Sequence, residues 1–193
     1  MLMRCEKMTY TCAAVGCAVL LTLTAGCGDE QKAVPSAPAA QTEQVKDSAD
    51  KSVQQPKQLQ TNIYYPRSDG MGLTAVSRTL STEKDDKYTA ALKSLLMGTK
   101  EKGQTNVIPK KAKLLRVTVQ DGIAAADFSK ELQQNFSGGS TGEEMLIGSI
   151  VNTLTEFPEV QRVRILIDGA PVETLSGHMD LSEPLARMTE LLK

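Results

Sequence analysis

All four cysteines of this 193-residue chain lie near its amino terminus, and their position limits what can hold the fold together. They are Cys5, Cys12, Cys17 and Cys27. A domain formed by the residues after Cys27 therefore has no disulfide, no thiolate metal site and no cysteine nucleophile. Such a domain depends on its hydrophobic core for stability.

The first 26 residues are organised like an export signal. Arg4 and Lys7 place positive charge at the start, and an apolar stretch leads to the small residues Ala25 and Gly26. An uncleaved membrane anchor is the alternative, but crossing a bilayer takes about 20 apolar residues. The run from Met8 to Thr24 has seventeen residues, four of them threonine. We therefore expect residues 1–26 to be a signal peptide.

The segment from Leu23 to Cys27 resembles the lipobox of bacterial lipoproteins. That resemblance implies that Cys27 receives a diacylglycerol, becomes the first residue of the mature protein, and anchors it to the membrane on the extracytoplasmic side. Cys17, which follows Ala14-Val15-Gly16, is a second candidate, but its apolar run is too short. Cys27 is the predicted lipidation site.

The composition changes after Cys27. From Gly28 to Leu59 the chain is rich in Gln, Ala, Pro, Ser, Lys and Asp, with no aromatic residue and no apolar period. Such a segment buries too little apolar surface to offset its chain entropy. Residues 27–59 are thus predicted to be the lipidated cysteine and a disordered tether with a span of about 30 Å. An extra helix is the alternative, but three prolines interrupt the segment.

Residues 60–193 have the size of a single domain. They carry sixteen Lys and Arg and seventeen Asp and Glu, and this balance gives no reason to expect nucleic-acid binding. The one basic cluster is Lys110, Lys111, Lys113 and Arg116. We interpret it as a solvated edge, with membrane or glycan contact as the alternative.

A first helix is predicted by apolar residues at helical spacing. Asp85 and Asp86 precede it and suit a helix start, and Gly98 follows as a stop. The residues expected to face the core are Tyr88, Ala91, Leu92, Leu95 and Leu96.

A second helix is predicted from Thr141 to about Phe157. Thr141 and Glu144 have the spacing of a capping box, and Pro158 ends the segment. Its buried face is expected to contain Ile147, Ile150, Val151 and Leu154.

Alternating apolar and polar residues predict strands around these helices. Asp121-Gly122 and Asp168-Gly169 are strong signals for tight turns between strands. We expect strands at 62–65, 73–80, 115–119 (with Leu115, Val117 and Val119 on one face), 123–128, 163–167 and 172–175. One or two helical turns are expected within 183–192. This order predicts an α+β two-layer sandwich, a mixed sheet with helices on one face.

No set of residues predicts an active site. The only histidine, His178, lies between Ser176 and Asp180, but residues two apart rarely converge on one atom and no Gly-x-Ser-x-Gly elbow is present. Ser137-Gly138-Gly139-Ser140 suits a turn before a helix better than a phosphate site, and the acidic residues lack metal spacing. We predict no catalytic residue, no metal site and no cofactor.

Several blocks of the domain resemble the GerMN domain of sporulation and spore-germination proteins. They are Ala125 to Ser129, Gly138 to Ser140, Glu144, Val151 to Pro158, Val163, Ile165 to Gly169 and Gly177 to Asp180, within a span from Asn62 to Arg187. The resemblance implies an exported lipoprotein whose domain is similar to the ring-building motifs of secretion channels. Some members of the family carry the domain in tandem, whereas this sequence has one copy. The resemblance implies no catalytic residue.

Two functions follow as hypotheses. The first is a non-enzymatic scaffold of the cell envelope, in sporulation or germination. Its domain would associate with membrane or peptidoglycan-bound proteins through a sheet edge or helix face, and a ring of copies is one form of this. The alternative is a lipoprotein that binds a glycan, peptide or small molecule. A concave pocket with converging polar groups would favour the second, and flat apolar patches the first.

Overall fold

The computed structural model describes residues 57–193. The predicted signal peptide, the lipidation site Cys27 and nearly all of the predicted tether lie outside these residues. At the predicted boundary the domain begins two residues earlier than expected, because Gln58 and Leu59 already pair with Ser81 and Leu80 of a neighbouring strand. Gln58 and Leu59, which were expected to belong to the tether, are therefore part of the described domain.

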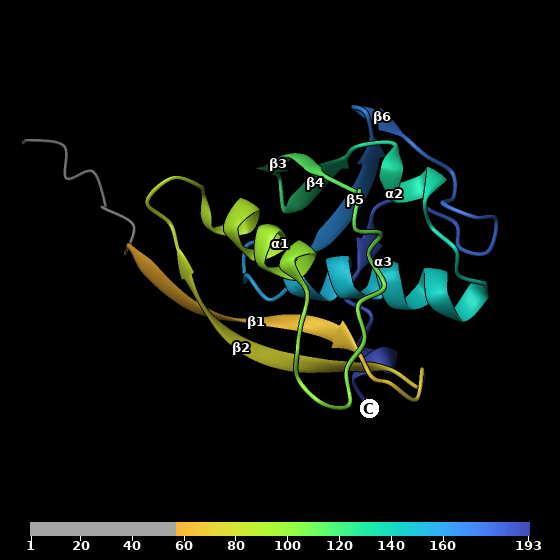
Figure 1. Cartoon of the computed structure of the whole chain (residues 1–193). Coiled ribbons are helices and arrows are strands. Elements are labelled where there is room, and N and C mark those ends of the chain that lie inside the picture. Colours follow the sequence, from red (N-terminus) through yellow and green to blue (C-terminus); the bar gives the residue numbers. More distant parts are fainter. Residues whose placement is uncertain (1–56) are drawn as a thin grey trace, which may run out of the picture. The chain divides into compact units, whose positions relative to one another are not determined.

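The chain forms two sheets with helices between them (Figure 1). The first sheet is an antiparallel pair, and the second has five strands in the order β3-β4-β5-β6, with β7 also on β5. The elements are β1 (Gln58–Pro66), β2 (Leu73–Ser81), α1 (Lys87–Met97), β3 (Leu114–Gln120), β4 (Ile123–Phe128), α2 (Glu131–Gln134), α3 (Ser140–Leu154), β5 (Arg162–Ile167), β6 (Ala170–Pro171), β7 (Leu185–Ala186) and a final 3-10 turn (Thr189–Leu192).

The α+β class and the mixed sheet are confirmed, since β4 and β5 are parallel while the other pairs are antiparallel. The expectation of one sheet covered on one face differs from the structure, because β1 and β2 form a separate sheet on the other side of α1 and α3. The backbone N–H of Tyr64 in β1 donates to Thr153 Oγ1 of α3 at 3.1 Å. A helix, not another strand, therefore covers this edge of β1.

The predicted boundaries of helix α1 are confirmed. Asp86 is the N-cap, and its carboxylate accepts the backbone N–H groups of Tyr88 and Thr89, each at 2.9 Å. Gly98 ends the helix with a φ of 78°, a conformation that favours glycine. Leu92 and Leu95 are buried as expected.

Helix α3 is the centre of the domain. Every residue from Met145 to Leu154 is buried, and a helix buried all round must be covered on both sides. The predicted capping box is wrong: Gly139 is the N-cap, and Thr141 lies exposed inside the first turn. Gly148 allows close packing, because a Cβ there would lie 2.4 Å from Leu191 Cδ1.

Both predicted tight turns are confirmed. Asp121 and Gly122 have φ values of 51° and 77°, and Asp168 and Gly169 have 48° and 80°, as in a type I′ turn. Leu115 was expected to face the core, but half of its surface is exposed. The register of β3 shifts between Leu114 and Arg116, and this bulge turns Leu115 outward.

Two elements near the carboxyl terminus differ from the prediction. Residues 172–175 form no strand, because the N–H of Leu175 is bound by a carboxylate of α3. The one or two helical turns expected within 183–192 are present only as the 3-10 turn Thr189–Leu192, because Leu185 and Ala186 pair with the free edge of β5.

Candidate functional site

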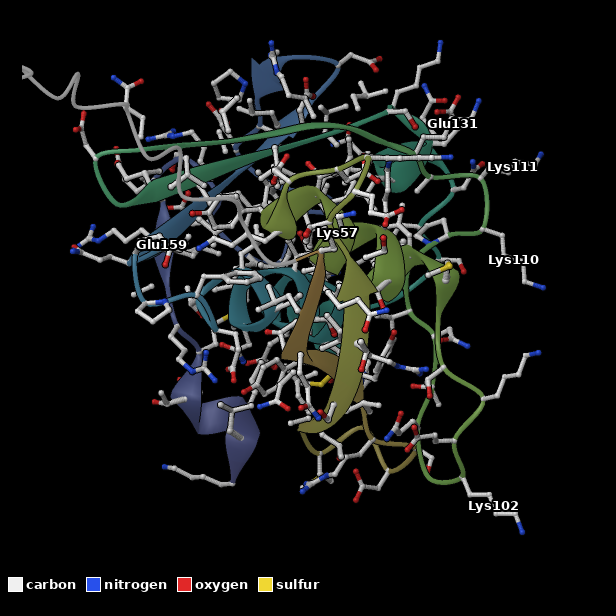
Figure 2. The ribbon with its side chains drawn as sticks, turned by 90° about the vertical axis from the view of Figure 1, so that its left-hand side faces the viewer. Lys57, Lys102, Lys110, Lys111, Glu131 and Glu159 are labelled. Carbon is white, nitrogen blue, oxygen red and sulfur yellow. The ribbon has the colours of Figure 1, made fainter. Side chains whose placement is uncertain are left out.

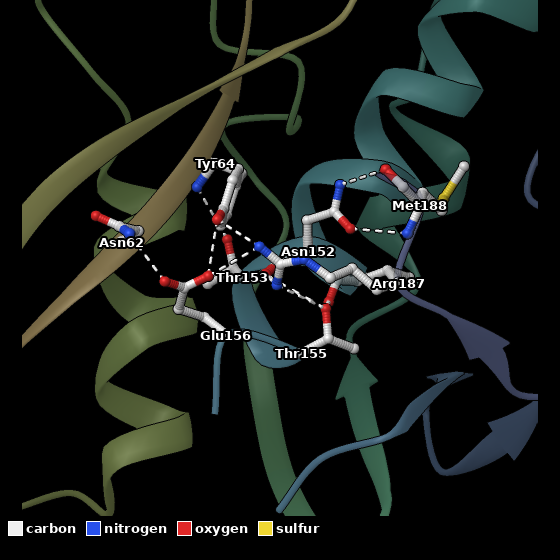
Figure 3. Close-up of polar contacts among 9 residues, drawn as sticks. Asn62, Tyr64, Asn152, Thr153, Thr155, Glu156, Arg187 and Met188 are labelled. Atoms are coloured by element: carbon white, nitrogen blue, oxygen red, sulfur yellow. Dashed lines mark hydrogen bonds and ion pairs between the residues drawn. The ribbon is translucent and has the colours of Figure 1, made fainter. Parts of the chain in front are cut away.

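A polar network joins three parts of the chain around the carboxylate of Glu156, just after α3 (Figure 3). Asn62 Nδ2 donates to Oε1 at 2.8 Å, and the Tyr64 hydroxyl donates to Oε2 at 2.7 Å. Arg187 Nη2 donates to the same Oε2 at 2.9 Å. We call Asn62, Tyr64, Glu156 and Arg187 the Glu156 network. It ties β1 and the carboxyl-terminal segment to the end of α3.

Arg187 is held by more than its ion pair. Its Nη2 lies 2.5 Å from the Tyr64 hydroxyl, and its guanidinium carbon lies 5.1 Å from the centre of the Tyr64 ring. Its Nη1 donates to Asn152 O and to Thr155 Oγ1, each at 3.3 Å. Four oxygen atoms and the Tyr64 ring thus orient this guanidinium, and Arg is suited to such planar, multiple contacts.

The electrostatics of the network keep Glu156 charged. Burial alone raises the pKa of Glu156, but hydrogen bonds from Tyr64, Asn62 and Arg187 outweigh it and hold the pKa below its usual range. Burial, together with the bond to Glu156, raises the pKa of the Tyr64 phenol. At neutral pH Tyr64 is therefore a neutral donor and Glu156 an anion whose bonding is satisfied within the protein.

An open groove of about 440 Å³ runs beside this network. Its lining combines amides, hydroxyls and one carboxylate with apolar side chains: Leu59, Gln60, Thr61, Asn62, Ser77, Glu156, Phe157 and Pro158. Asn62 and Glu156 belong to both the network and the groove, so the network fixes their orientation. A surface of this kind matches ligands rich in hydroxyl and amide groups.

Sequence reasoning missed a second polar cluster, centred on Glu143 in the first turn of α3. Its side chain is fully buried and accepts five hydrogen bonds of 2.7 to 3.0 Å. The donors are Thr174 Oγ1, Leu175 N, Ser176 N, Ser176 Oγ and His178 N. Burial alone raises the pKa of Glu143, but these bonds outweigh it and lower the pKa to about 2. We call this cluster the Glu143 anchor.

The Glu143 anchor explains where the residues around His178 lie. The backbone N–H of His178 donates to Glu143 at 3.0 Å, while its side chain is exposed. Ser176 Oγ donates to Glu143, and Asp180 accepts the backbone N–H of Ser182 at 2.9 Å. The structure therefore places Ser176, His178 and Asp180 in a loop built around a buried carboxylate and does not bring their side chains together.

The other sequence candidates lie apart from one another. Gly138 and Gly139 precede α3, where the Phe136 ring lies so close that a Cβ on Gly138 would be 2.4 Å from it. Lys110, Lys111 and Arg116 are exposed. Within residues 57–193 no group of three or more His, Cys, Asp or Glu side chains could hold a metal ion. No helix among the same residues is long and apolar enough to span a membrane.

The members of the Glu156 network are separated by up to 125 positions, and no local pattern marks them. Glu143 does carry a signal, because it stands beside Glu144 at the start of the predicted helix. The capping-box interpretation assigned the structural role to Glu144. The signal that Glu143 is buried is the helix itself: α3 is buried on all sides, so a charged residue in its first turn can be buried too.

The fold and its polar clusters define a small α+β domain whose buried carboxylates Glu143 and Glu156 are hydrogen-bonded within the protein. The family described as "Germane: Sporulation and spore germination" matches residues 62–173. The chain belongs to this family. A comparison with curated protein sequences gave no match.

Two solved GerMN structures have the same fold. The first GerMN domain of the sporulation protein GerM from Bacillus subtilis aligns with a TM-score of 0.53 and 24% identity, over 67% of this chain and 98% of that one. The tandem GerMN domains of the same protein align with a TM-score of 0.54 and 23% identity, over 69% of this chain and 45% of that one. A candidate lipoprotein from Clostridium perfringens aligns with a TM-score of 0.47 and 25% identity, over 68% of this chain and 88% of that one. The described domain thus spans less than half of the tandem protein.

Proposed function

We propose that this chain is a lipid-anchored, non-enzymatic protein of the cell envelope whose GerMN domain binds other envelope proteins during sporulation or germination. Residues 1–26 are the signal peptide, Cys27 carries the lipid, and the tether gives the domain freedom on the extracytoplasmic side. Membership of a sporulation and germination family supports the setting. The anchor on Cys27 rests on the lipobox resemblance.

One structural observation carries the binding role: β3 stands at the end of the five-stranded sheet, with no further strand beside it in the described part of the chain. An open sheet edge offers backbone groups and side chains to a partner. Leu115, turned outward by the bulge, is half exposed on this strand, and Arg116 and Thr118 are exposed as well. We place the partner contact here.

The test compares two variants of the lipidated protein in its native cells. Cys27→Ser removes the anchor, and Leu115→Glu with Thr118→Glu places charge on the β3 edge. Both should lower sporulation or germination while the melting temperature of the edge variant stays within a few degrees. Thr79→Glu, on the exposed face of β2, is the matched control. Normal sporulation and germination in the edge variant would contradict this placement of the contact.

The groove beside the Glu156 network supports a second candidate, a lipoprotein that binds a glycan or peptide. Its polar residues converge on an open concave surface, and Asn62 and Glu156 are pre-oriented. Gln60 lines the groove but lies outside the network, and its Nε2 bonds only Ser77 Oγ, at 3.0 Å. Gln60→Ala should therefore weaken calorimetric binding of a soluble muropeptide without altering the fold. If calorimetry detects no binding of the muropeptide to the unchanged chain, this second candidate function is wrong.

A further inference from the structure

The connection between α1 and β3 is long and strongly basic. It spans residues 98–113 and contains neither helix nor strand. Connections of this length without secondary structure are uncommon in compact domains and are often functional. This one carries five lysines, at positions 100, 102, 110, 111 and 113, and a single acidic residue, Glu101.

The connection is held in a defined shape. Thr99 N donates to Asn106 Oδ1 at 2.8 Å, and Asn106 Nδ2 donates back to Thr99 O at 3.1 Å. The end of the β1–β2 hairpin binds it as well, because Ser68 N donates to Gly103 O and Thr105 N donates to Pro66 O, each at 2.9 Å. Its lysines are therefore presented by an ordered backbone.

Three of these lysines lie along one side of the domain. Figure 2 shows the side chains of Lys102, Lys110 and Lys111 extending into solvent along the same side, with Glu131 beyond Lys111 and Glu159 on the opposite side. None of the three lysines forms an ion pair with another described residue. We call Lys102, Lys110 and Lys111 the lysine edge. Its charge is free to attract an anionic partner.

Two large apolar side chains are exposed on segments that adjoin this connection. Met97 ends α1 immediately before the connection and is 82% exposed. Met71 is 73% exposed in the β1–β2 turn, whose backbone is hydrogen-bonded to the connection. They are the two most exposed large hydrophobic residues of the described chain. Lysines beside exposed apolar side chains are the composition of surfaces that lie in a membrane interface.

We infer that the lysine edge, with Met71 and Met97, docks the domain on an anionic phospholipid surface. All five cations of the connection are lysine and none is arginine. Arginine is preferred where individual phosphates are recognised with fixed geometry, whereas lysine acts as a flexible point charge toward a diffuse anionic surface. The exposed methionines favour a bilayer over a soluble polyanion, because only a bilayer offers them an apolar phase. This goes beyond the proposed function and does not require acylation of Cys27.

The test is co-sedimentation of the full chain carrying Cys27→Ser, which cannot be acylated at that position. The vesicles contain phosphatidylglycerol with phosphatidylcholine, or phosphatidylcholine alone, so the neutral vesicles measure any contribution of the apolar leader. Binding to the anionic vesicles should exceed binding to neutral ones and should fall as salt is raised from about 0.1 M to 0.5 M. Equal binding to both vesicle types would overturn the inference.

Variants locate the contact. The triple change Lys102→Gln, Lys110→Gln and Lys111→Gln should weaken binding to anionic vesicles about 100-fold, at about fivefold per lysine. The matched control, Lys57→Gln, Lys84→Gln and Arg162→Gln, removes the same charge from exposed positions elsewhere and should change binding about threefold or less. An equal loss in both triple variants, or no loss in the first, would overturn the lysine edge as the contact.

Binding to soluble polyphosphate distinguishes a bilayer partner from a soluble polyanion. Met71→Gln with Met97→Gln should weaken binding to anionic vesicles and leave polyphosphate binding unchanged, because polyphosphate has no apolar phase. If the methionine variant binds vesicles as tightly as the unchanged chain while polyphosphate competes fully, the partner is a soluble polyanion and the membrane assignment is wrong.

Discussion

Glu143→Gln should destabilise the domain and remove part of its sensitivity to acid. Gln keeps the shape of Glu but loses the charge, and its NH2 group cannot accept the backbone N–H groups of Leu175, Ser176 and His178. The pKa of Glu143 is lowered from 4.5 to about 2 in the folded chain, which corresponds to about 3 kcal/mol. We expect the free energy of unfolding at neutral pH to fall by roughly that amount.

The pH dependence has a definite sign. Because the pKa is lowered by folding, the unfolded chain takes up the proton first as the pH falls. This stabilisation is complete above about pH 5 and is lost as the pH falls from 4.5 toward about 2. At about pH 3 the difference in the free energy of unfolding between the unchanged chain and Glu143→Gln should therefore be about 2 kcal/mol smaller than at neutral pH.

Urea unfolding followed by circular dichroism at both pH values measures this difference. Glu144→Gln is the matched control, because it makes the same chemical change one residue away, where the carboxylate accepts no hydrogen bond from another residue of the described chain. It should change the free energy of unfolding by less than about 0.5 kcal/mol. A loss below about 0.5 kcal/mol in Glu143→Gln, or an equal loss at both pH values, would refute the reasoning.

Three further predictions concern packing, boundaries and the anchor. Leu95→Ala and Ile150→Ala should each cost about 2 to 5 kcal/mol in chemical unfolding, since both side chains are buried in helices that fill the space between the sheets. A chain starting at Lys57 should melt like one starting at Gly28, whereas a chain starting at Ile63 loses half of β1 and should melt lower by calorimetry. Cys27→Ser should abolish acylation, and mass spectrometry showing a lipid on another residue of the mature protein would contradict this prediction.

The local elements of this fold are predictable from sequence, because their signals lie within a few residues. Asp86 before an apolar stripe and Gly98 after it mark both ends of α1, and the Asp-Gly pairs mark both tight turns. The bulge at Leu115 carries no such signal, since the alternation of apolar residues continues through it. Its position depends on pairing with β4.

The separation into two sheets and both polar clusters depend on contacts distant in sequence. Glu156 meets Asn62 and Arg187 only after β1 and the carboxyl-terminal segment have reached the end of α3. The strand expected at 172–175 fails for a similar reason, because a buried carboxylate competes for backbone groups that a strand would have used. Strand propensity alone does not show whether residues 172–175 pair as a strand or bind the carboxylate of Glu143.

The position of β1 has a mechanical consequence. Chain that precedes the domain enters at Gln58, which pairs with Ser81 at the open end of the β1–β2 hairpin. Tension applied there separates the two strands one pair at a time, which requires less force than sliding them past each other. Four pairs further along, Asn62 and then Tyr64 are bound through Glu156 to α3 and through Arg187 to the carboxyl-terminal segment. Peeling that starts at Gln58 breaks strand pairs and the Gln60–Ser77 side-chain bond before it reaches Asn62, the first β1 residue whose side chain is hydrogen-bonded outside the hairpin. Pulling would therefore release a few residues of β1 before the force reached the end of α3.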